Sequence, residues 1–410
     1  MGYNRNILRS AARRLTRRRK EAELIPDEVI ERQLAMPICG KTAEETGAEA
    51  VFRSGRDMAR QGDWAEVAAL MVVHDRARDM TPDGTPLAEL LSAGARSDLV
   101  LSLQRAARSG VLSPRHYSIE CLEEFCAEVT EDVSGDYAGY GTAILLSETL
   151  MDAGWAWYEQ GTMLSSPDRN LTMFTELFGR AAKQIEPFSA LEENAPALAA
   201  TNCALLAGNP DASRRILDEY EDLIDLNPAA PGHQRAFGLH LMPQWFGNYA
   251  LLEVQALKVA AQTQDLWGAG GYTWVWLDVL ALDPAGFAYL DLEYFLDGID
   301  DILSRRSSQH FVNLFAAFIS RYLVHNGDGP DRGQRKALVH RRASLIRGRM
   351  RELHPWVWGS SPLIGAVGRH RPDRERSASF RDGRDLARLA LADVFASELS
   401  SASIRTSHPA

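Results

Sequence analysis

Cysteines, long apolar runs and β-branched runs are all scarce in this sequence of 410 residues. Only four cysteines occur and none belongs to a Cys-x-x-Cys pair, which fits buried small side chains in a reducing compartment. The best candidate for a membrane span, residues 311–319, is too short and contains Asn313. Since the first residues also lack the apolar core of a secretory signal, we expect a cytoplasmic protein without a transmembrane segment.

Motifs for catalysis, cofactor binding and metal coordination are also missing. His233 and His240 are seven residues apart and could share a helix face, but no third ligand accompanies them. Glu123 and Glu124 belong to a carboxylate cluster without His or Asn ligands, so a solvated acidic face is the better interpretation. The sequence therefore predicts a non-enzymatic protein with no catalytic, cofactor-binding or metal-binding residue, and an α-helical enzyme is the least supported alternative.

What the sequence does contain favours helices. Hydrophobic residues make up 45% and charged residues 24%, and the helix formers Ala, Leu, Arg and Glu dominate. Pro196 suits the first turn of a helix that stops at residues 208–210, Gly-Asn-Pro. The next helix has an apolar stripe at spacings of three and four: Ile216, Leu217, Tyr220, Leu223 and Ile224. The whole helix–turn–helix unit spans roughly 34 residues, the period of tetratricopeptide repeats.

A second landmark is the turn at residues 241–248, Leu-Met-Pro-Gln-Trp-Phe-Gly-Asn. Through its Leu-x-Pro-x-Trp-x-Gly order, the stretch 196–286 resembles the divergent tetratricopeptide-repeat-like (TPR-like) regions of uncharacterised bacterial proteins. Near the N-terminus, Gly55, Gly62 and Trp64 stand where such repeats place a close-approach glycine, a turn glycine and an aromatic residue. The resemblance implies an all-α solenoid of helix–turn–helix pairs with a protein-binding groove, and it transfers no catalytic residue.

Aromatic residues beside turns are the candidates for lining such a groove. They are Trp64, Tyr140, Trp245, Tyr249, Trp267, Tyr272 and Trp274. Aromatic residues at such spacings also occur in cores, and replacing a buried Trp64 by Ala should cost about 3–5 kcal/mol. The predicted function is that of a scaffold or interaction module that holds a protein or peptide partner, such as a helix, in the concave groove.

Charge is distributed unevenly along the chain. Residues 1–20 hold eight basic and no acidic residues, and residues 331–384 hold fourteen basic and five acidic ones. Because the whole chain has a net charge of −10 and residues 385–410 contribute −1, residues 21–330 carry −26. Two basic ends thus flank an acidic body, which indicates ends that touch nucleic acid, an anionic membrane surface or the body itself.

The arginine-rich ends support an alternative function, nucleic-acid-associated regulation through residues 1–20 and 331–384. Residues 1–20 would also suit peripheral contact with a membrane, and a solvated tail is the plain alternative. For the C-terminal basic helix we favour capping of the solenoid over the stacking of bases or phosphates. The candidate residues at the two ends are Arg13, Arg14, Arg17, Arg18, Arg341, Arg342 and Arg349.

Turn-forming and helix-breaking residues (Gly, Pro and Asn) divide the chain into five predicted segments. The strongest break signal is Asn-Gly-Asp-Gly-Pro at residues 326–330. Inside the body, Gly94 predicts a break between two short helices, and Asp75 is expected at the surface or in the groove. The segments are a basic tail (1–24), an acidic TPR-like body (25–325), a basic capping helix (331–359), a linker (360–382) and an amphipathic helix (383–400).

Overall fold

The computed structural model describes residues 25–112, 118–132, 139–164, 167–324, 329–359 and 373–399. Within these ranges all regular structure is helical, apart from two isolated β-bridges. The all-α class predicted from composition is therefore confirmed. None of the described helices is long and apolar enough to cross a membrane. Four of the basic-end candidates lie outside the described residues: Arg13, Arg14, Arg17 and Arg18.

The chain divides into two compact units. Among the described residues, the first unit comprises 44–247, and the second combines 25–43, 248–359 and 373–399. The division falls between Gly247 and Asn248, at the end of the predicted Pro-Trp turn. The single body predicted for residues 25–325 therefore spans both units.

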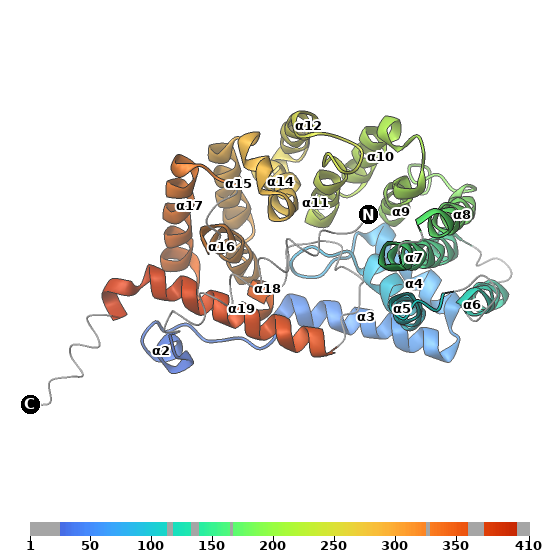
Figure 1. Ribbon diagram of the computed structural model, residues 1–410, viewed down its shortest axis with the longest axis horizontal. Helices are drawn as coiled ribbons and strands as arrows, with labels where there is room; N and C mark the ends of the chain where they lie inside the picture. Colours follow the sequence, from blue (N-terminus) through green and yellow to red (C-terminus); the bar gives the residue numbers. More distant parts are fainter. Residues whose placement is uncertain are drawn as a thin grey trace, which may run out of the picture. The chain divides into compact units, whose positions relative to one another are not determined.

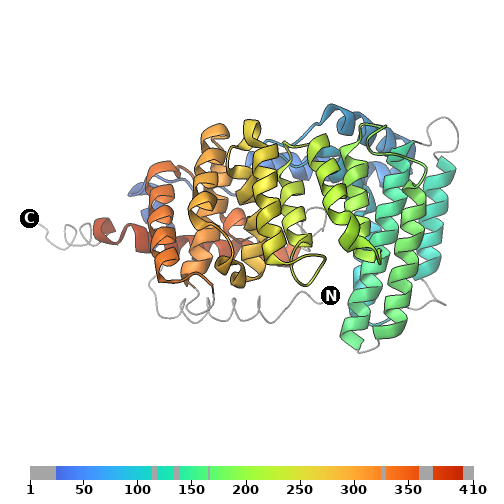
Figure 2. The ribbon, with the colours of Figure 1, turned by 90° about the horizontal axis from the view of Figure 1, so that it is seen from above.

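Helices of the first unit pack mainly against helices close to them in the sequence. The longest, α7, lies beside α8 in both views (Figure 1, Figure 2), and it also contacts α4, α5 and α9. The elements are α3 (Ala43–Gln61), α4 (Trp64–Ala77), α5 (Leu87–Arg108), α6 (Ser118–Asp132), α7 (Tyr140–Leu164), α8 (Pro167–Ile185), α9 (Pro196–Leu205), η1 (Leu206–Gly208), α10 (Ala212–Leu226) and α11 (Pro231–His240).

Two glycines allow the backbones of α3 and α5 to touch. A Cβ atom on Gly55 of α3 would overlap the carbonyl oxygen of Leu91 in α5, and one on Gly94 of α5 would overlap the carbonyl oxygen of Phe52 in α3. Gly55 is thus a close-approach glycine, as predicted. The predicted break at Gly94 is wrong, because α5 runs uninterrupted through this residue and the missing side chain serves helix packing.

The second unit is built around α14. This helix is buried on all sides over residues 270–280, which fits a sequence that is apolar on every face apart from Thr273 and Asp278. It packs between α12 and α15, and Figure 1 shows α14, α15 and α16 next to one another. The elements are α2 (Asp27–Arg32), α12 (Tyr249–Gln262), α13 (Gln264–Trp267), α14 (Gly270–Leu282), η2 (Pro284–Ala288), α15 (Leu292–Arg305), α16 (Gln309–Val324), α17 (Arg332–Ser344), the π-helical turn η3 (Leu345–Arg349), α18 (Pro355–Gly359) and α19 (Asp373–Val394).

Side-chain caps fix where several of these helices begin. Asn248 accepts a hydrogen bond from the Leu251 N–H at 2.9 Å and starts α12, and Asp331 forms a capping box with Gln334 at the start of α17. At the other end of the unit, α19 begins at Asp373 rather than at Gly383. The second half of the predicted linker 360–382 is therefore helical.

Candidate functional site

The predicted groove aromatics are mostly core residues. Only Trp245 is half-buried, and the other six are at most 8% exposed: Trp64, Tyr140, Tyr249, Trp267, Tyr272 and Trp274. Their expected exposure is therefore wrong, because these large rings fill the interior of their own units. The Trp64 ring, for example, packs edge-to-face on Phe125 with 4.9 Å between the ring centroids.

The described basic-end candidates are engaged within the second unit. Arg341 forms an ion pair with Asp300 of α15, and Arg349 lies 3.7 Å from the same carboxylate. Arg342 is buried and forms an ion pair with Asp393 of α19. These three guanidinium groups therefore lie beside acidic residues of their own unit, Asp300 within the predicted acidic body and Asp393 outside it.

The two histidines considered as a metal pair have separate partners. His233 Nε2 lies 2.7 Å from Glu89 Oε1 in the first unit. His240 Nδ1 lies 3.0 Å from the Tyr220 hydroxyl, and burial lowers the pKa of this imidazole to about 4. Each ring thus has its own partner in a partly buried contact, and His240 is neutral at physiological pH.

Asp75 also departs from its expected surface position. Its side chain is buried (5% exposed) and contacts two other helices. One carboxylate oxygen accepts the Ala197 N–H in the first turn of α9 at 2.8 Å, and the other accepts the Tyr140 hydroxyl of α7 at 3.2 Å. Burial raises the pKa of Asp75 to about 6. The carboxyl group therefore links α4 to α7 and α9 and loses its proton at a higher pH than an exposed aspartate does.

One exposed surface has the pattern of an interaction site, and it lies on α12. Val254 and Leu257 are 60% and 46% exposed, and Ala250 and Ala261 are exposed on either side of them. The spacings of four, three and four residues repeat those of a coiled-coil seam. Because the opposite side of α12 is buried in the core of its unit, this helix is apolar on two faces. We call residues 250, 254, 257 and 261 the α12 stripe.

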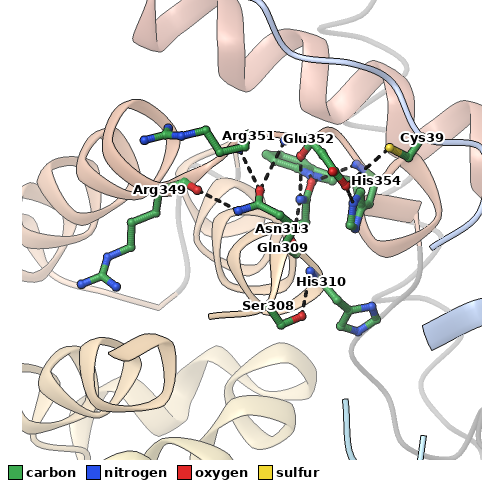
Figure 3. A network of polar contacts seen from close by, with 10 residues as sticks. Cys39, Ser308, Gln309, His310, Asn313, Arg349, Arg351, Glu352 and His354 are labelled. Atoms are coloured by element: carbon green, nitrogen blue, oxygen red, sulfur yellow. Dashed lines mark hydrogen bonds and ion pairs between the residues drawn. The ribbon is translucent and has the colours of Figure 1, made fainter. Parts of the chain in front are cut away.

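A second candidate is a polar network near the start of α16, in the second unit (Figure 3). Gln309, in the first turn of this helix, holds the backbone of the loop after η3. Its Nε2 donates to the Arg349 carbonyl at 3.0 Å, and its Oε1 accepts the N–H groups of Arg351 at 2.7 Å and of Glu352 at 3.3 Å. The amide side chain thereby binds three consecutive peptide groups, from the end of η3 into the loop.

Asn313, one turn further along α16, uses its full hydrogen-bonding capacity. Its Nδ2 donates to the carbonyls of Gln309 at 2.8 Å and of Glu352 at 2.9 Å. Its Oδ1 accepts the N–H of His354 at 3.0 Å and the indole N–H of Trp358 at 2.8 Å. The residue is fully buried, so losing any of these partners would leave an unsatisfied polar atom. Asn313 therefore holds residues 352–354 in a defined conformation.

A short parallel bridge brings a distant segment to the same loop. The Cys39 N–H donates to the Leu353 carbonyl at 2.8 Å, and the Leu353 N–H donates to the Pro37 carbonyl at 2.9 Å. Successive side chains of extended backbone point to opposite sides, so Glu352 and His354 both point away from the side of Leu353. Figure 3 shows Cys39 facing these two side chains.

The three side chains meet at the Glu352 carboxylate. Its Oε2 lies 3.1 Å from His354 Nε2 and 3.6 Å from Cys39 Sγ. His354 is 4% exposed and Glu352 is 45% exposed, so the cluster is anchored in the interior and open to solvent at the carboxylate. The hydrogen bond with His354 lowers the pKa of Glu352, and the bond from the Cys39 thiol acts in the same direction.

Sequence reasoning missed this cluster. Within the described part of the chain, this is the one group of three His, Cys or acidic side chains that could hold a metal ion. Its donor atoms all lie within 4.8 Å of one another. Cys39 and Glu352 are 313 positions apart, so no spacing motif joins them. The one local signal was Glu-Leu-His at residues 352–354, which places two potential ligands on one side of an extended segment.

No family model, curated protein or solved structure matches the chain. The α12 stripe and the cluster of Cys39, Glu352 and His354 are therefore the two candidate sites.

Proposed function

We propose that this protein is a non-enzymatic interaction module that binds a partner helix along the α12 stripe. The observation that supports this function most directly is the exposure of Val254 and Leu257 on a helix whose other face is already buried. A solvent-exposed seam with coiled-coil spacing fits an amphipathic helix of a partner, whose own apolar residues would cover it.

The neighbourhood of the stripe supports the same function. Leu266 of α13, a few residues after the end of α12, is another large apolar residue that is 44% exposed. Many consecutive helices of each unit pack against one another, as in TPR-like helix–turn–helix pairs. We therefore propose a TPR-like module whose binding surface is an outer helix face, in place of a groove lined by the buried aromatics.

The predicted nucleic-acid function finds less support at the C-terminal end. Arg341, Arg342 and Arg349 pair with carboxylates of their own unit, so binding a polyanion there would have to break these ion pairs. For residues 1–20, which lie outside the described residues, nucleic-acid or membrane binding stays a prediction.

The test is a pull-down from the native host lysate with the full chain, followed by mass spectrometry and nucleic-acid analysis of the eluates. The variant under test combines Val254→Lys and Leu257→Lys. Its matched control combines Val73→Lys and Leu171→Lys, which change equally exposed apolar residues of α4 and α8. Both double variants should keep the helical circular dichroism of the wild type, because exposed substitutions have small effects on stability.

We expect a protein partner that is recovered in near-stoichiometric amounts with the wild type and the control, and lost with the α12 variant. Retention of that partner by the α12 variant would refute the stripe as its binding surface. Nucleic acid released by high salt, with no protein partner, would instead favour the arginine-rich ends.

A further inference from the structure

We propose that Cys39, Glu352 and His354 bind one divalent transition-metal ion, with zinc as the best match. The donor atoms are a thiol sulfur, a carboxylate oxygen and an imidazole nitrogen, which are the three kinds of ligand that proteins use for zinc. Calcium and magnesium prefer sites made only of oxygen atoms, so a sulfur and a nitrogen among three ligands select against them.

Two of the three separations between donor atoms match those around a tetrahedral ion, and all three lie within 4.8 Å. Zinc–ligand bonds of about 2.0–2.3 Å at tetrahedral angles place a nitrogen and an oxygen about 3.3 Å apart, and a sulfur and an oxygen about 3.6 Å apart. The observed separations are 3.1 Å between His354 Nε2 and Glu352 Oε2, and 3.6 Å between Cys39 Sγ and Glu352 Oε2. An ion could therefore replace the two hydrogen bonds to the Glu352 carboxylate. The Cys39 and His354 donor atoms, which lie within 4.8 Å of each other, would then be about 3.6 Å apart.

The surrounding structure holds the ligands in place without an ion. Asn313 fixes the backbone on both sides of Leu353, and the two hydrogen bonds of the parallel bridge fix Cys39 against the same residue. Such outer contacts orient metal ligands and reduce the entropy lost on binding. The partial exposure of Glu352 leaves room for water as a fourth ligand and gives the ion a path from solvent.

The protons that must leave the ligand atoms when zinc binds limit the affinity that we expect. Binding converts the Cys39 thiol to a thiolate, and its proton is released to solvent. Binding through His354 Nε2 also requires the ring proton to lie on Nδ1, which is buried without a hydrogen-bond partner among the described residues. Three protein ligands and one unsatisfied ring proton indicate a micromolar site rather than a picomolar one. Through its coordination bonds, the bound ion would link Cys39 to Glu352 and His354, and so link the segment 37–39 to the loop at 352–354.

The test uses tag-free full chain, reduced and treated with a chelator. Zinc affinity is measured by competition with a chromophoric chelator, and cobalt is added in a parallel titration to detect the absorption band of a cobalt–thiolate bond. The variants are Cys39→Ser and Glu352→Gln, in which the amide oxygen can still accept a hydrogen bond from His354. Cys126→Ser is the matched control, since Cys126 is also half-buried and burial raises the pKa of its thiol to about 11.

We expect the wild type and Cys126→Ser to bind one equivalent of zinc and to show the cobalt–thiolate band. Cys39→Ser should lose the band, and both Cys39→Ser and Glu352→Gln should bind zinc at least about tenfold more weakly. The proposal is overturned if the wild type shows no saturable binding at micromolar zinc, or if Cys39→Ser keeps the affinity and the band of the wild type. Circular dichroism of each variant confirms that a loss of binding does not reflect unfolding.

Discussion

Asp75 offers a direct test of how the first unit is stabilised. The carboxyl group is buried between three helices and accepts hydrogen bonds from the Ala197 N–H and the Tyr140 hydroxyl. Asparagine has the same shape and keeps a carbonyl oxygen for the Ala197 N–H, and its amide can donate to the Tyr140 hydroxyl oxygen. Asp75→Asn therefore removes the buried negative charge while it preserves the contacts, much as protonation of Asp75 would.

The magnitude follows from the pKa of Asp75. Burial raises it from 3.8 to about 6, against the opposing effects of the hydrogen bonds from Ala197 and Tyr140 and of the charge on Arg78. Between these two values the folded protein binds more protons than the unfolded chain, so stability falls as the pH rises from about 4 to about 6. A shift of about two units corresponds to roughly 3 kcal/mol, which is the upper limit of the gain that Asp75→Asn should give at neutral pH.

The assay is chemical denaturation of the wild type and Asp75→Asn between pH 4 and pH 8. The two proteins should unfold at similar denaturant concentrations near pH 4, and the variant should become the more stable one as the pH rises through about 6. Glu66→Gln is the control, because it removes a carboxylate that is exposed to solvent on the same helix. A pH-independent difference, or a variant less stable at pH 8 than at pH 4 relative to the wild type, would refute the assignment of a buried charge to Asp75.

Two further predictions concern packing in the first unit. Trp64→Ala should lower the free energy of unfolding by about 3–5 kcal/mol because the indole is buried against Phe125, and an unchanged melting temperature would show that the ring is not part of the core. Gly94→Ala should destabilise the protein by about 1–3 kcal/mol or more, because the new Cβ atom would overlap the Phe52 carbonyl. Gly179→Ala is the control: its Cβ atom has open space around it, so the substitution should stabilise the protein by up to about 1 kcal/mol. Equal effects of the two substitutions in thermal unfolding would contradict the close approach of α3 and α5.

Much of the fold could be predicted because local chemistry and packing agree. Pro196 begins α9, and the predicted stripe forms the buried face of α10, with Leu217 half-buried and its other four residues buried. In contrast, the role of Gly94 could not be predicted from its neighbours in the sequence. A glycine that ends a helix and one that permits contact with another helix look alike until the partner, here Phe52, is known.

The two candidate sites were less accessible to sequence reasoning, for different reasons. The cluster of Cys39, Glu352 and His354 depends on a single β-bridge between distant segments, which no periodicity reveals. The groove prediction used aromatic residues, but large rings are the side chains that gain most from burial, and Trp267 and Trp274 pack against each other in the core. Aromatic residues near turns therefore indicate packed helix ends at least as much as binding surfaces.

The binding free energy that the α12 stripe can contribute follows from the apolar surface it exposes. Full burial of an aliphatic side chain contributes about 1.5–3 kcal/mol, so Val254 and Leu257 of the stripe and the nearby Leu266, each about half exposed, offer roughly 3 kcal/mol together. Micromolar binding requires about 8 kcal/mol, and a partner helix must therefore also make contacts outside the stripe. Even so, Val254 and Leu257 supply about 2 kcal/mol of this energy, and its loss weakens binding about thirtyfold. A lysine placed against an apolar partner adds a desolvation cost. The double lysine variant should thus abolish a moderate-affinity interaction, whereas a partner held mainly by polar contacts elsewhere would survive it.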